Sequence, residues 1–191
     1  MLLDATLLAL ALTYQFRVGQ EEKIRAEQLA MVDPLTGVNN RRAFYDITAP
    51  IWNIATRHNH NLSVVLLDLD NFKRINDVHG HACGDELLVA TVNALKKTVR
   101  DQDVVARWGG EEFILLLPET NLPEATALAE RLRSAIAGTR LNCEGAEIGV
   151  TASIGVAQRG TQHRDLDAVI STADGYLYQA KDLGRNRVSH A

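Results

Sequence analysis

Hydrophobic and polar positions change their period along this chain, and the changes predict alternating strands and helices after residue 33. The clearest strand lies in NLSVVLLDLDNF, residues 61–72, where an apolar run ends at two aspartates. Two more apolar runs flank Gly109-Gly110, and a glycine pair at this place predicts a hairpin with a two-residue turn. The segments expected as strands are 61–72, 103–108, 111–118, 147–157 and 185–190.

Apolar residues at helical spacing predict helices between these strands. Residues 84–99 carry a stripe of leucine and valine, residues 123–136 begin with a proline, and residues 165–184 end at a glycine. Asn39 or Asn40 is expected to cap a further helix. Because both hairpins and crossovers join the strands, the sequence predicts an α/β (α+β) fold, with a central antiparallel sheet surrounded by helices.

Residues 1–32 precede the turn-forming cluster DPLTGVNN and are expected to form a helical arm or linker, with the domain proper over 33–191. The apolar stretch at the start is shorter than the roughly 20 residues that span a bilayer. It also lacks the basic region and cleavage site of a signal peptide. Two interpretations stay open, the end of a longer transmembrane helix and an amphipathic helix that forms a coiled coil with a second copy.

Composition and charge narrow the classes of function. The 191 residues are 46% hydrophobic and 23% charged, as in a globular domain. The net charge of −4 disfavours sequence-independent binding to nucleic acid, so a phosphate-rich ligand would need a metal ion or a few local cations. Cys83 and Cys143 lack metal-ligand spacing and are interpreted as free thiols in a reducing compartment, which places the domain in the cytoplasm.

Acidic residues at the ends of two predicted strands form the first candidate site. Asp68 and Asp70 share one face of their strand, and Glu111 and Glu112 begin the neighbouring strand if the two strands pair. Crowded carboxylates repel one another and resist ionisation, and a Mg²⁺ ion with phosphate oxygens would relieve the repulsion. Each acidic pair taken alone is more simply interpreted as solvated strand-end residues, but their co-occurrence favours a metal site.

The segment after the acidic strand carries polar residues suited to a nucleotide. Lys73 lies where it can meet a phosphate. Asn76 and Asp85 can recognise a base, and a carboxylate suits the N1–H and N2 donors of guanine rather than adenine. The alternative interpretations are a turn histidine at His81 and a helix N-terminal acid at Asp85. The chain has neither a P-loop nor a dinucleotide-binding glycine motif.

Together these segments resemble the GGDEF domain of the diguanylate cyclase family. The signature stands at 109–113 in its GGEEF form, and the resemblance runs in order and spacing from Asp33 to the end. The other matching blocks are DPLTGVNNRRAF, DLDNFKRINDVHGHACGDELL, SIGVA and ADGYLYQAKDLGRNRV. The resemblance implies the palm-like fold of nucleotidyl cyclases and the condensation of two GTP molecules into cyclic di-GMP and two pyrophosphates. Each domain would hold one GTP, so the active form would be a homodimer.

The resemblance also implies roles for the residues near the signature. Asp68 and Glu111 match ligands of two Mg²⁺ ions per active site, for which Mn²⁺ can substitute, and Leu69 matches a ligand through its carbonyl. Glu112 matches the acid assigned as proton acceptor for the 3′-hydroxyl group, or alternatively as ligand of the second metal. Lys73 matches a lysine that contacts phosphate and stabilises the transition state.

Substrate and product contacts follow from the same resemblance. Asn76 and Asp85 match the residues that read guanine, and His81 lies in the same segment. Lys181 and Arg185 match contacts to the triphosphate.

A second site is implied just before the signature. Arg100 and Asp103 form the R-x-x-D motif of the family's inhibitory site for cyclic di-GMP, to which Arg131 would contribute. A surface ion pair near a helix end is the simpler alternative.

The main rival is a catalytically silent receptor of the same family that binds cyclic di-GMP or GTP, and a purely structural dimerising module is a second rival. Degenerate members lose a signature acid or the metal aspartate, whereas Asp68, Glu111, Glu112 and Lys73 are all present here. The family usually joins this domain to an upstream sensor or membrane segment. We therefore expect a longer parent protein, anchored in the inner membrane if the arm is the end of a transmembrane helix.

Overall fold

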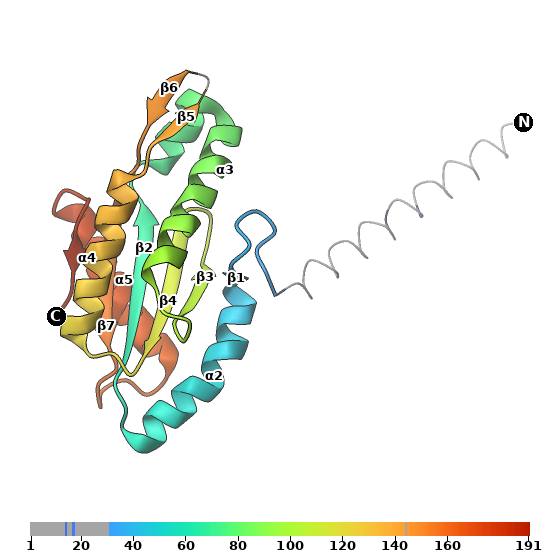
Figure 1. Ribbon diagram of the computed structural model, residues 1–191. Coiled ribbons are helices and arrows are strands. Elements are labelled where there is room, and N and C mark those ends of the chain that lie inside the picture. The colour runs from blue at the N-terminus through green and yellow to red at the C-terminus, as the bar shows by residue number, and fades with distance from the viewer. Residues whose placement is uncertain (1–13, 15–16, 18–30, 144) are drawn as a thin grey trace, which may run out of the picture. The chain divides into compact units, whose positions relative to one another are not determined.

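The computed structural model describes residues 14, 17, 31–143 and 145–191 (Figure 1). The chain divides into two compact units, Met1–Met31 and Val32–Ala191, and the second contains the elements discussed below. The arm and coiled coil expected over 1–32 therefore lie almost entirely outside the described residues. Within the described ranges, no helix is both long and apolar enough to cross a membrane.

A six-stranded sheet with the order β1-β3-β4-β2-β7-β8 forms the centre of the second unit. Its four inner strands pair antiparallel, whereas the short edge strands β1 and β8 pair in parallel with their neighbours. This sheet confirms the predicted class and its antiparallel centre. The strands are β1 (Asn39–Asn40), β2 (Leu62–Leu69), β3 (Val104–Arg107), β4 (Glu112–Pro118), β7 (Ala152–Gln158) and β8 (Val188–Ser189).

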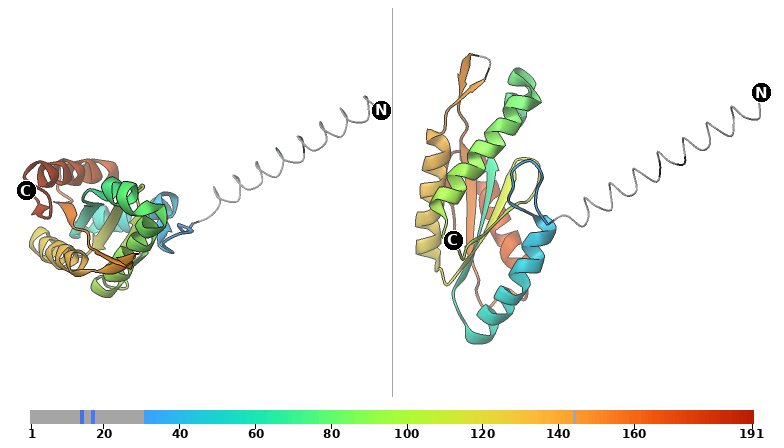
Figure 2. Two further views of the ribbon diagram at one scale, coloured as in Figure 1. Left: turned by 90° about the horizontal axis from the view of Figure 1, so that it is seen from above. Right: turned by 45° about the vertical axis from the view of Figure 1, so that its right-hand side comes forward.

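Helices cover both faces of the sheet, which explains the unbroken apolar run in β2 (Figure 2). Val65 and Leu67 pack into a core with side chains of α3 and α4, while Val64 and Leu66 pack on the other face with α2 and α5. Successive residues of β2 therefore enter two different cores, and neither face of the strand is exposed to solvent. The helices are α2 (Arg41–His58), α3 (Phe72–Thr98), α4 (Leu122–Gly138) and α5 (Leu166–Asp182).

Side-chain caps set the starts of three helices. The side chain of Asn40 accepts a hydrogen bond from the amide of Ala43 at 2.9 Å, which confirms the predicted asparagine cap. Asn121 and Glu124 form a reciprocal capping box at α4, and Asp165 caps α5.

The helix predicted at 84–99 begins earlier in the structure, at Phe72, and has a kink. Gly80 has φ 80° and ψ 160°, so α3 consists of two helical segments joined at this residue. A positive φ of this kind favours glycine, which explains the residue at the kink.

Two sequence predictions about strand connections are wrong. The connection between β3 and β4 has four residues, 108–111, and neither Gly109 nor Gly110 has the positive φ that the predicted two-residue turn requires. The strand predicted at 147–157 is divided in two. Its first part, β6 (Ala146–Ile148), pairs with β5 (Leu141–Cys143) in a separate hairpin, and its second part is β7.

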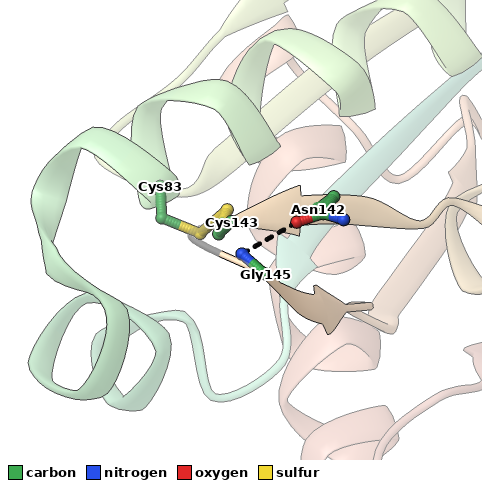
Figure 3. Close-up of a disulfide and its surroundings, with 4 residues drawn as sticks. All are labelled: Cys83, Asn142, Cys143 and Gly145. Carbon is green, nitrogen blue, oxygen red and sulfur yellow. Dashed lines mark hydrogen bonds between the residues drawn. A yellow bond between two sulfur atoms is a disulfide. The ribbon is translucent and has the colours of Figure 1, made fainter.

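Cys83 and Cys143 form a disulfide, so their interpretation as free thiols is wrong (Figure 3). Cys83 lies in α3 and Cys143 ends β5, 60 residues later in the sequence. The unpredicted hairpin brings the second cysteine to the first, and the sequence spacing carried no signal of this contact.

Candidate functional site

Two acidic segments meet where β2 ends and β4 begins. Asp68 stands directly opposite Glu112 in the antiparallel register, and the amide of Leu69 donates to the carbonyl of Glu111 at 3.3 Å. Burial raises the pKa of Asp68. Burial and then the charge of Asp68 raise the pKa of Glu112. Two facing carboxylates that resist ionisation favour a bound cation between or beside them.

Lys181 supplies one such cation from the last turn of α5. Its Nζ lies 2.8 Å from Oδ2 of Asp68, and this contact opposes the effect of burial on the pKa of the aspartate. Arg185 follows in the left-handed region with φ 64°, and its charge also acts on Asp68. The structure therefore brings the two predicted triphosphate residues to the same carboxylate that was predicted to bind metal.

Gly109 makes room for the carboxylate of Glu112. A Cβ atom on Gly109 would lie 2.7 Å from Oε2 of Glu112, whereas one on Gly110 would meet nothing within 4 Å. Because the backbone at neither glycine needs a positive φ, the space beside Glu112 is the physical reason for glycine at 109.

Arg107 holds residues 108–111, here called the signature loop, in place. The sequence analysis did not identify this arginine. Its Nη2 donates to the carbonyl of Gly110 at 2.7 Å, and its Nε is shared between the carbonyls of Gly109 and Gly110 at 3.2 and 3.1 Å. Its Nη1 reaches Asp33 at 3.1 Å. An arginine directly before the Trp-Gly-Gly run was the one signal that could have found it.

Trp108 attaches the same loop to α2. Its ring lies edge-on to Phe44 with the centroids 5.7 Å apart, and the guanidinium carbon of Arg41 lies 4.1 Å from its centroid. The loop is thus fixed on one side by a charged network and on the other by aromatic packing.

Asp70 is buried beside the site but is committed to other partners. It accepts hydrogen bonds from the hydroxyls of Thr151 and Ser153, both at 2.6 Å, and from the amide of Asn186 at 3.0 Å. These bonds tie the end of β2 to β7 and to the segment that follows α5. The expected crowd of carboxylates therefore has Asp68 and Glu112 at its centre, and Asp70 acts as a positioning residue.

The two segments of α3 bring the predicted guanine-reading residues together. The side chain of Asn76, in the first segment, lies against Gly84 in the second, where any Cβ atom would overlap it. Asp85 follows Gly84 and is exposed, as are Lys73 and His81. Asn76 and Asp85 therefore lie near each other across the kink, although nine positions separate them in the sequence.

The three residues of the predicted inhibitory site line one cavity of about 180 Å³. The amide of Arg100 donates to Oδ2 of Asp103 at 2.8 Å, and the amide of Asp103 donates to the carbonyl of Arg100 at 3.1 Å. Burial raises the pKa of Asp103, against the effect of Arg100. Arg131, from α4, also lines the cavity, so two arginines from separate segments contribute to it.

Comparison with known families agrees with this geometry. The model of the family described as diguanylate cyclase, GGDEF domain, matches residues 30–187. The chain belongs to the GGDEF family. The diguanylate cyclase DgcM of Escherichia coli K12 is 43% identical over 173 residues, which are 88% of this chain and 41% of DgcM. The response regulator PleD of Caulobacter vibrioides is 39% identical over 84% of this chain and 36% of PleD. This GGDEF chain thus spans about two fifths of these relatives.

Solved structures confirm the GGDEF fold. The diguanylate cyclase SiaD of Pseudomonas aeruginosa, in complex with its activator SiaC, matches with a TM-score of 0.81 and 32% identity over 97% of this chain and 71% of SiaD. The GGDEF domain of DgcB from Caulobacter crescentus, in complex with c-di-GMP, matches with a TM-score of 0.80 and 29% identity over 84% of this chain and 95% of that domain. The nucleotidyl-cyclase-like fold expected from the sequence is therefore present.

The metal ligands that this GGDEF domain offers suit a divalent cation whose remaining ligands come from the substrate. Among the described residues, no group of three or more His, Cys, Asp or Glu side chains is arranged to hold a metal unaided. Asp68 lies opposite Glu112, and Glu111 directly precedes Glu112, so carboxylates from both chain segments are available. Mg²⁺ is typically bound by one or two carboxylates together with substrate phosphates. These residues therefore suit a metal ion that binds together with a nucleoside triphosphate.

Proposed function

We propose that this domain condenses two GTP molecules into cyclic di-GMP and two pyrophosphates in a Mg²⁺-dependent reaction. The observation that carries the proposal is the pairing of Asp68 with Glu112 across β2 and β4, with Lys181 at 2.8 Å from Asp68. Carboxylates for metal and a cation for phosphate thus converge where a triphosphate would lie. The family of the chain favours this reaction over others that use the same groups.

The acidic residues would divide the chemistry between them. Asp68, Glu111 and the carbonyl of Leu69 would hold Mg²⁺, with Mn²⁺ as a substitute. When bound, two such ions would activate the attacking oxygen and neutralise the leaving pyrophosphate. Glu112 would accept the proton of the 3′-hydroxyl group. Its raised pKa makes it a stronger base than an ordinary glutamate, which suits general base catalysis near neutral pH.

Each condensation forms one bond from a 3′-oxygen to an α-phosphorus and breaks the bond from that phosphorus to pyrophosphate. Lys73, Lys181 and Arg185 would neutralise the triphosphate while the charge shifts toward the leaving group. Lys181 lies beside Asp68, where its ammonium group would be available to a phosphate oxygen if a metal ion held the aspartate.

Asn76, Asp85 and His81 would select guanine. The carboxylate of Asp85 can accept from N1–H and from the exocyclic amine, which adenine does not offer in this arrangement. The kink at Gly80 and the small Gly84 allow Asn76 to approach the second segment of α3 and share the base with Asp85.

The active form would be a homodimer, because one site holds one GTP and its 3′-hydroxyl must attack the GTP of the partner. Residues 1–32 would be the arm or linker that controls this encounter, and 33–191 the cyclase domain. An upstream sensor or membrane segment in the parent protein would drive the arm, and the nucleotide substrate places the domain in the cytoplasm.

Cyclic di-GMP would also act as an inhibitor at the cavity lined by Arg100, Asp103 and Arg131. Guanidinium groups bind phosphates through paired hydrogen bonds and stack on purines. A bound product there would hold two domains apart and stop turnover.

The test is product analysis with Mg²⁺ and GTP, in which pyrophosphate and cyclic di-GMP are measured together. The proposal expects two pyrophosphates for each cyclic di-GMP and no product from ATP. The rival, a silent receptor, expects binding of cyclic di-GMP without pyrophosphate release. Hydrolysis of GTP to GDP and phosphate, or to GMP and pyrophosphate, without cyclic di-GMP synthesis or binding would overturn both.

A further inference from the structure

The disulfide between Cys83 and Cys143 links two parts of the molecule that are far apart in the sequence. The Cα atoms lie 6.0 Å apart, and both cysteines are buried in a small apolar cluster with Ile148 (Figure 3). The hairpin of β5 and β6 is closed by its own turn, in which the amide of Gly145 donates to Oδ1 of Asn142 at 3.0 Å. The disulfide therefore joins a self-contained hairpin to α3.

The point of attachment on α3 is next to the proposed guanine site. Cys83 directly precedes Gly84, against which Asn76 packs, and Asp85 follows. All three residues from 83 to 85 lie beyond the kink at Gly80, whereas Asn76 lies before it. A covalent link at Cys83 thus restrains the second segment of α3 at the place where it must meet the first.

Elsewhere the hairpin and the first segment of α3 face each other across open space. A cavity of about 530 Å³ has walls that include Arg74 and Val78 of α3 and Glu147 and Ile148 of the hairpin. Beside this gap, the cluster of Cys83, Cys143 and Ile148 is where the hairpin contacts the kinked helix, and Ile75 of the first segment packs against the same cluster.

We infer that Cys83 and Cys143 form a thiol–disulfide exchange site that reacts with dithiols and small disulfides and sets the affinity of the guanine site. The inference rests on the proposed function. A domain that uses GTP works where thiol reductants are abundant, and disulfides in such compartments are usually transient and redox-sensing rather than structural.

An external thiol–disulfide couple supplies or accepts the two electrons of this exchange. In reduction, a thiolate of an external dithiol attacks one of the two buried sulfurs, written here as that of Cys143. A mixed disulfide forms and Cys83 leaves as a thiolate. The second thiol of the reagent then attacks the mixed disulfide, which yields a cyclic or oxidised reagent and two protein thiols. Oxidation is the reverse, with a small disulfide such as oxidised glutathione as the electron acceptor.

The oxidised form holds the two segments of α3 in the arrangement that presents Asn76 and Asp85 together. Leu87, Leu88 and Leu95 hold the second segment in the main core in either redox state. Reduction therefore frees the hairpin and the first segment, whose Ile75 packs against the same cluster, and the first segment can then shift about Gly80. If about one third of the reduced molecules keep the competent arrangement, the apparent affinity for guanine nucleotide falls about threefold.

The experiment compares oxidised and reduced forms of the same chain. Oxidised glutathione or dithiothreitol sets the state, and alkylation with mass spectrometry counts the free thiols. Binding is measured with 3′-deoxy-GTP and Mg²⁺, because this nucleotide lacks the attacking hydroxyl and cannot be condensed. We expect a dissociation constant about threefold higher in the reduced form. The double variant Cys83→Ser/Cys143→Ser should show one dissociation constant under both treatments.

Three results would overturn the inference. They are alkylation of both cysteines after oxidation, equal affinity in the two forms, and an equal redox effect in the double variant. If the double variant does not fold, Cys143→Ser alone removes the disulfide and serves the same comparison. A redox-dependent affinity without any cyclic di-GMP synthesis would refute the proposed activity and leave the exchange site standing. Cyclic di-GMP synthesis with a redox-independent affinity would do the opposite.

Discussion

Arg107 and Asp33 join the first turn of the domain to its signature loop. Nη1 of Arg107 donates to both carboxylate oxygens of Asp33, at 3.1 and 3.2 Å, while the other nitrogens of the same guanidinium hold the carbonyls of Gly109 and Gly110. Asp33 also accepts from the amide and the hydroxyl of Thr36. Asp33, near the start of the second unit, is therefore linked through Arg107 to the loop that carries Glu111 and leads into Glu112.

Replacing Arg107 should destabilise the domain and disorder the signature loop. Arg107→Ala removes a guanidinium that is 17% exposed and leaves the 16% exposed carboxylate of Asp33 without its ion pair. Hydrogen bonds to charged groups contribute about 1.5–3 kcal/mol, so the free energy of unfolding should fall by about 2–3 kcal/mol in urea titrations. Arg107→Lys should recover little, because an ammonium group cannot reach both partners at once.

The matched control for Arg107 is Arg164→Ala. Arg164 and Asp165 are 3.2 Å apart, with side chains 90% and 49% exposed, and such pairs contribute at most about 1 kcal/mol. A loss for Arg107→Ala no larger than for Arg164→Ala would contradict a structural role of the Arg107 network.

A fall in pH should destabilise the domain through protonation of Asp33. Burial raises the pKa of this group, but the hydrogen bonds from Thr36 and the charge of Arg107 outweigh burial and hold it below its usual value. A carboxylate with a lowered folded pKa contributes stability above its unfolded pKa, near 4, and loses that stability as the pH falls through the folded value. Between about pH 5 and pH 3, the parent should therefore lose more stability than Asp33→Asn.

Asp68 and Glu112 act in the opposite direction, because their raised pKa values mean that acid relieves an unfavourable charge in the folded state. The parent and Asp33→Asn both contain Asp68 and Glu112. The difference between their stabilities therefore reports the effect of Asp33 alone. Parallel stability curves for parent and Asp33→Asn in urea titrations over this range would contradict the assignment.

The two signature glycines should respond differently to alanine. In Gly109→Ala the new methyl group would displace the carboxylate of Glu112, whereas in Gly110→Ala it would enter open space. Because a flexible side-chain tip can move, we expect both variants to fold. The turnover number of Gly109→Ala should fall at least about tenfold, since a misplaced catalytic group has effects of this size or larger. Gly110→Ala should stay within about twofold of the parent. Equal losses in both would mean that the loop backbone, rather than the space beside Glu112, requires glycine.

The sequence predicted the main strands, the asparagine cap of α2 and the antiparallel centre because these depend on local patterns. The run from Val64 to Leu67 and the cap at Asn40 are read directly from neighbouring residues. The four-residue loop at 108–111 was missed because a glycine pair is also typical of tight turns. The loop is instead held by the amide of Trp108, which donates to the carbonyl of Glu112, and by Arg107, which donates to the carbonyls of Gly109 and Gly110, and the glycine pattern encodes none of these bonds.

The parts of the site that could not be predicted depend on contacts between distant segments. Asp33 and Arg107 are 74 positions apart, and Cys83 and Cys143 are 60 positions apart. Asp70 carries the same charge as Asp68 and follows it by two positions, so the strand pattern treats the two alike. The sequence therefore gives no sign that the side chain of Asp70 is hydrogen-bonded to Thr151 and Ser153. The acidic residues could be identified from composition and spacing. Which of them face the site depends on the fold.

The proposed inhibitory cavity leads to a separate prediction about regulation. Arg100→Ala and Arg131→Ala should each raise the concentration of cyclic di-GMP that halves the rate by about tenfold or more, equivalent to about 1.4 kcal/mol of binding. The initial rate without added product should change little, because neither residue lies at the Asp68–Glu112 pair. Arg164→Ala removes a guanidinium that is 90% exposed and serves as the control for loss of charge. Inhibition that is unchanged in both cavity variants would exclude the cavity as the inhibitory site.

The most direct test of the central claim is cyclic di-GMP synthesis from GTP and Mg²⁺ by the parent and by Glu112→Gln. The parent should form product, and the variant should be at least about 100-fold slower, as expected for loss of a general base. Glu119→Gln, beyond the far end of β4, should match the parent. Burial and neighbouring negative charges raise the pKa of Glu112, so the neutral glutamine should not lower the melting temperature, and slow turnover would not reflect unfolding. Equal synthesis by parent and Glu112→Gln, or none by the parent despite bound cyclic di-GMP, would contradict the account.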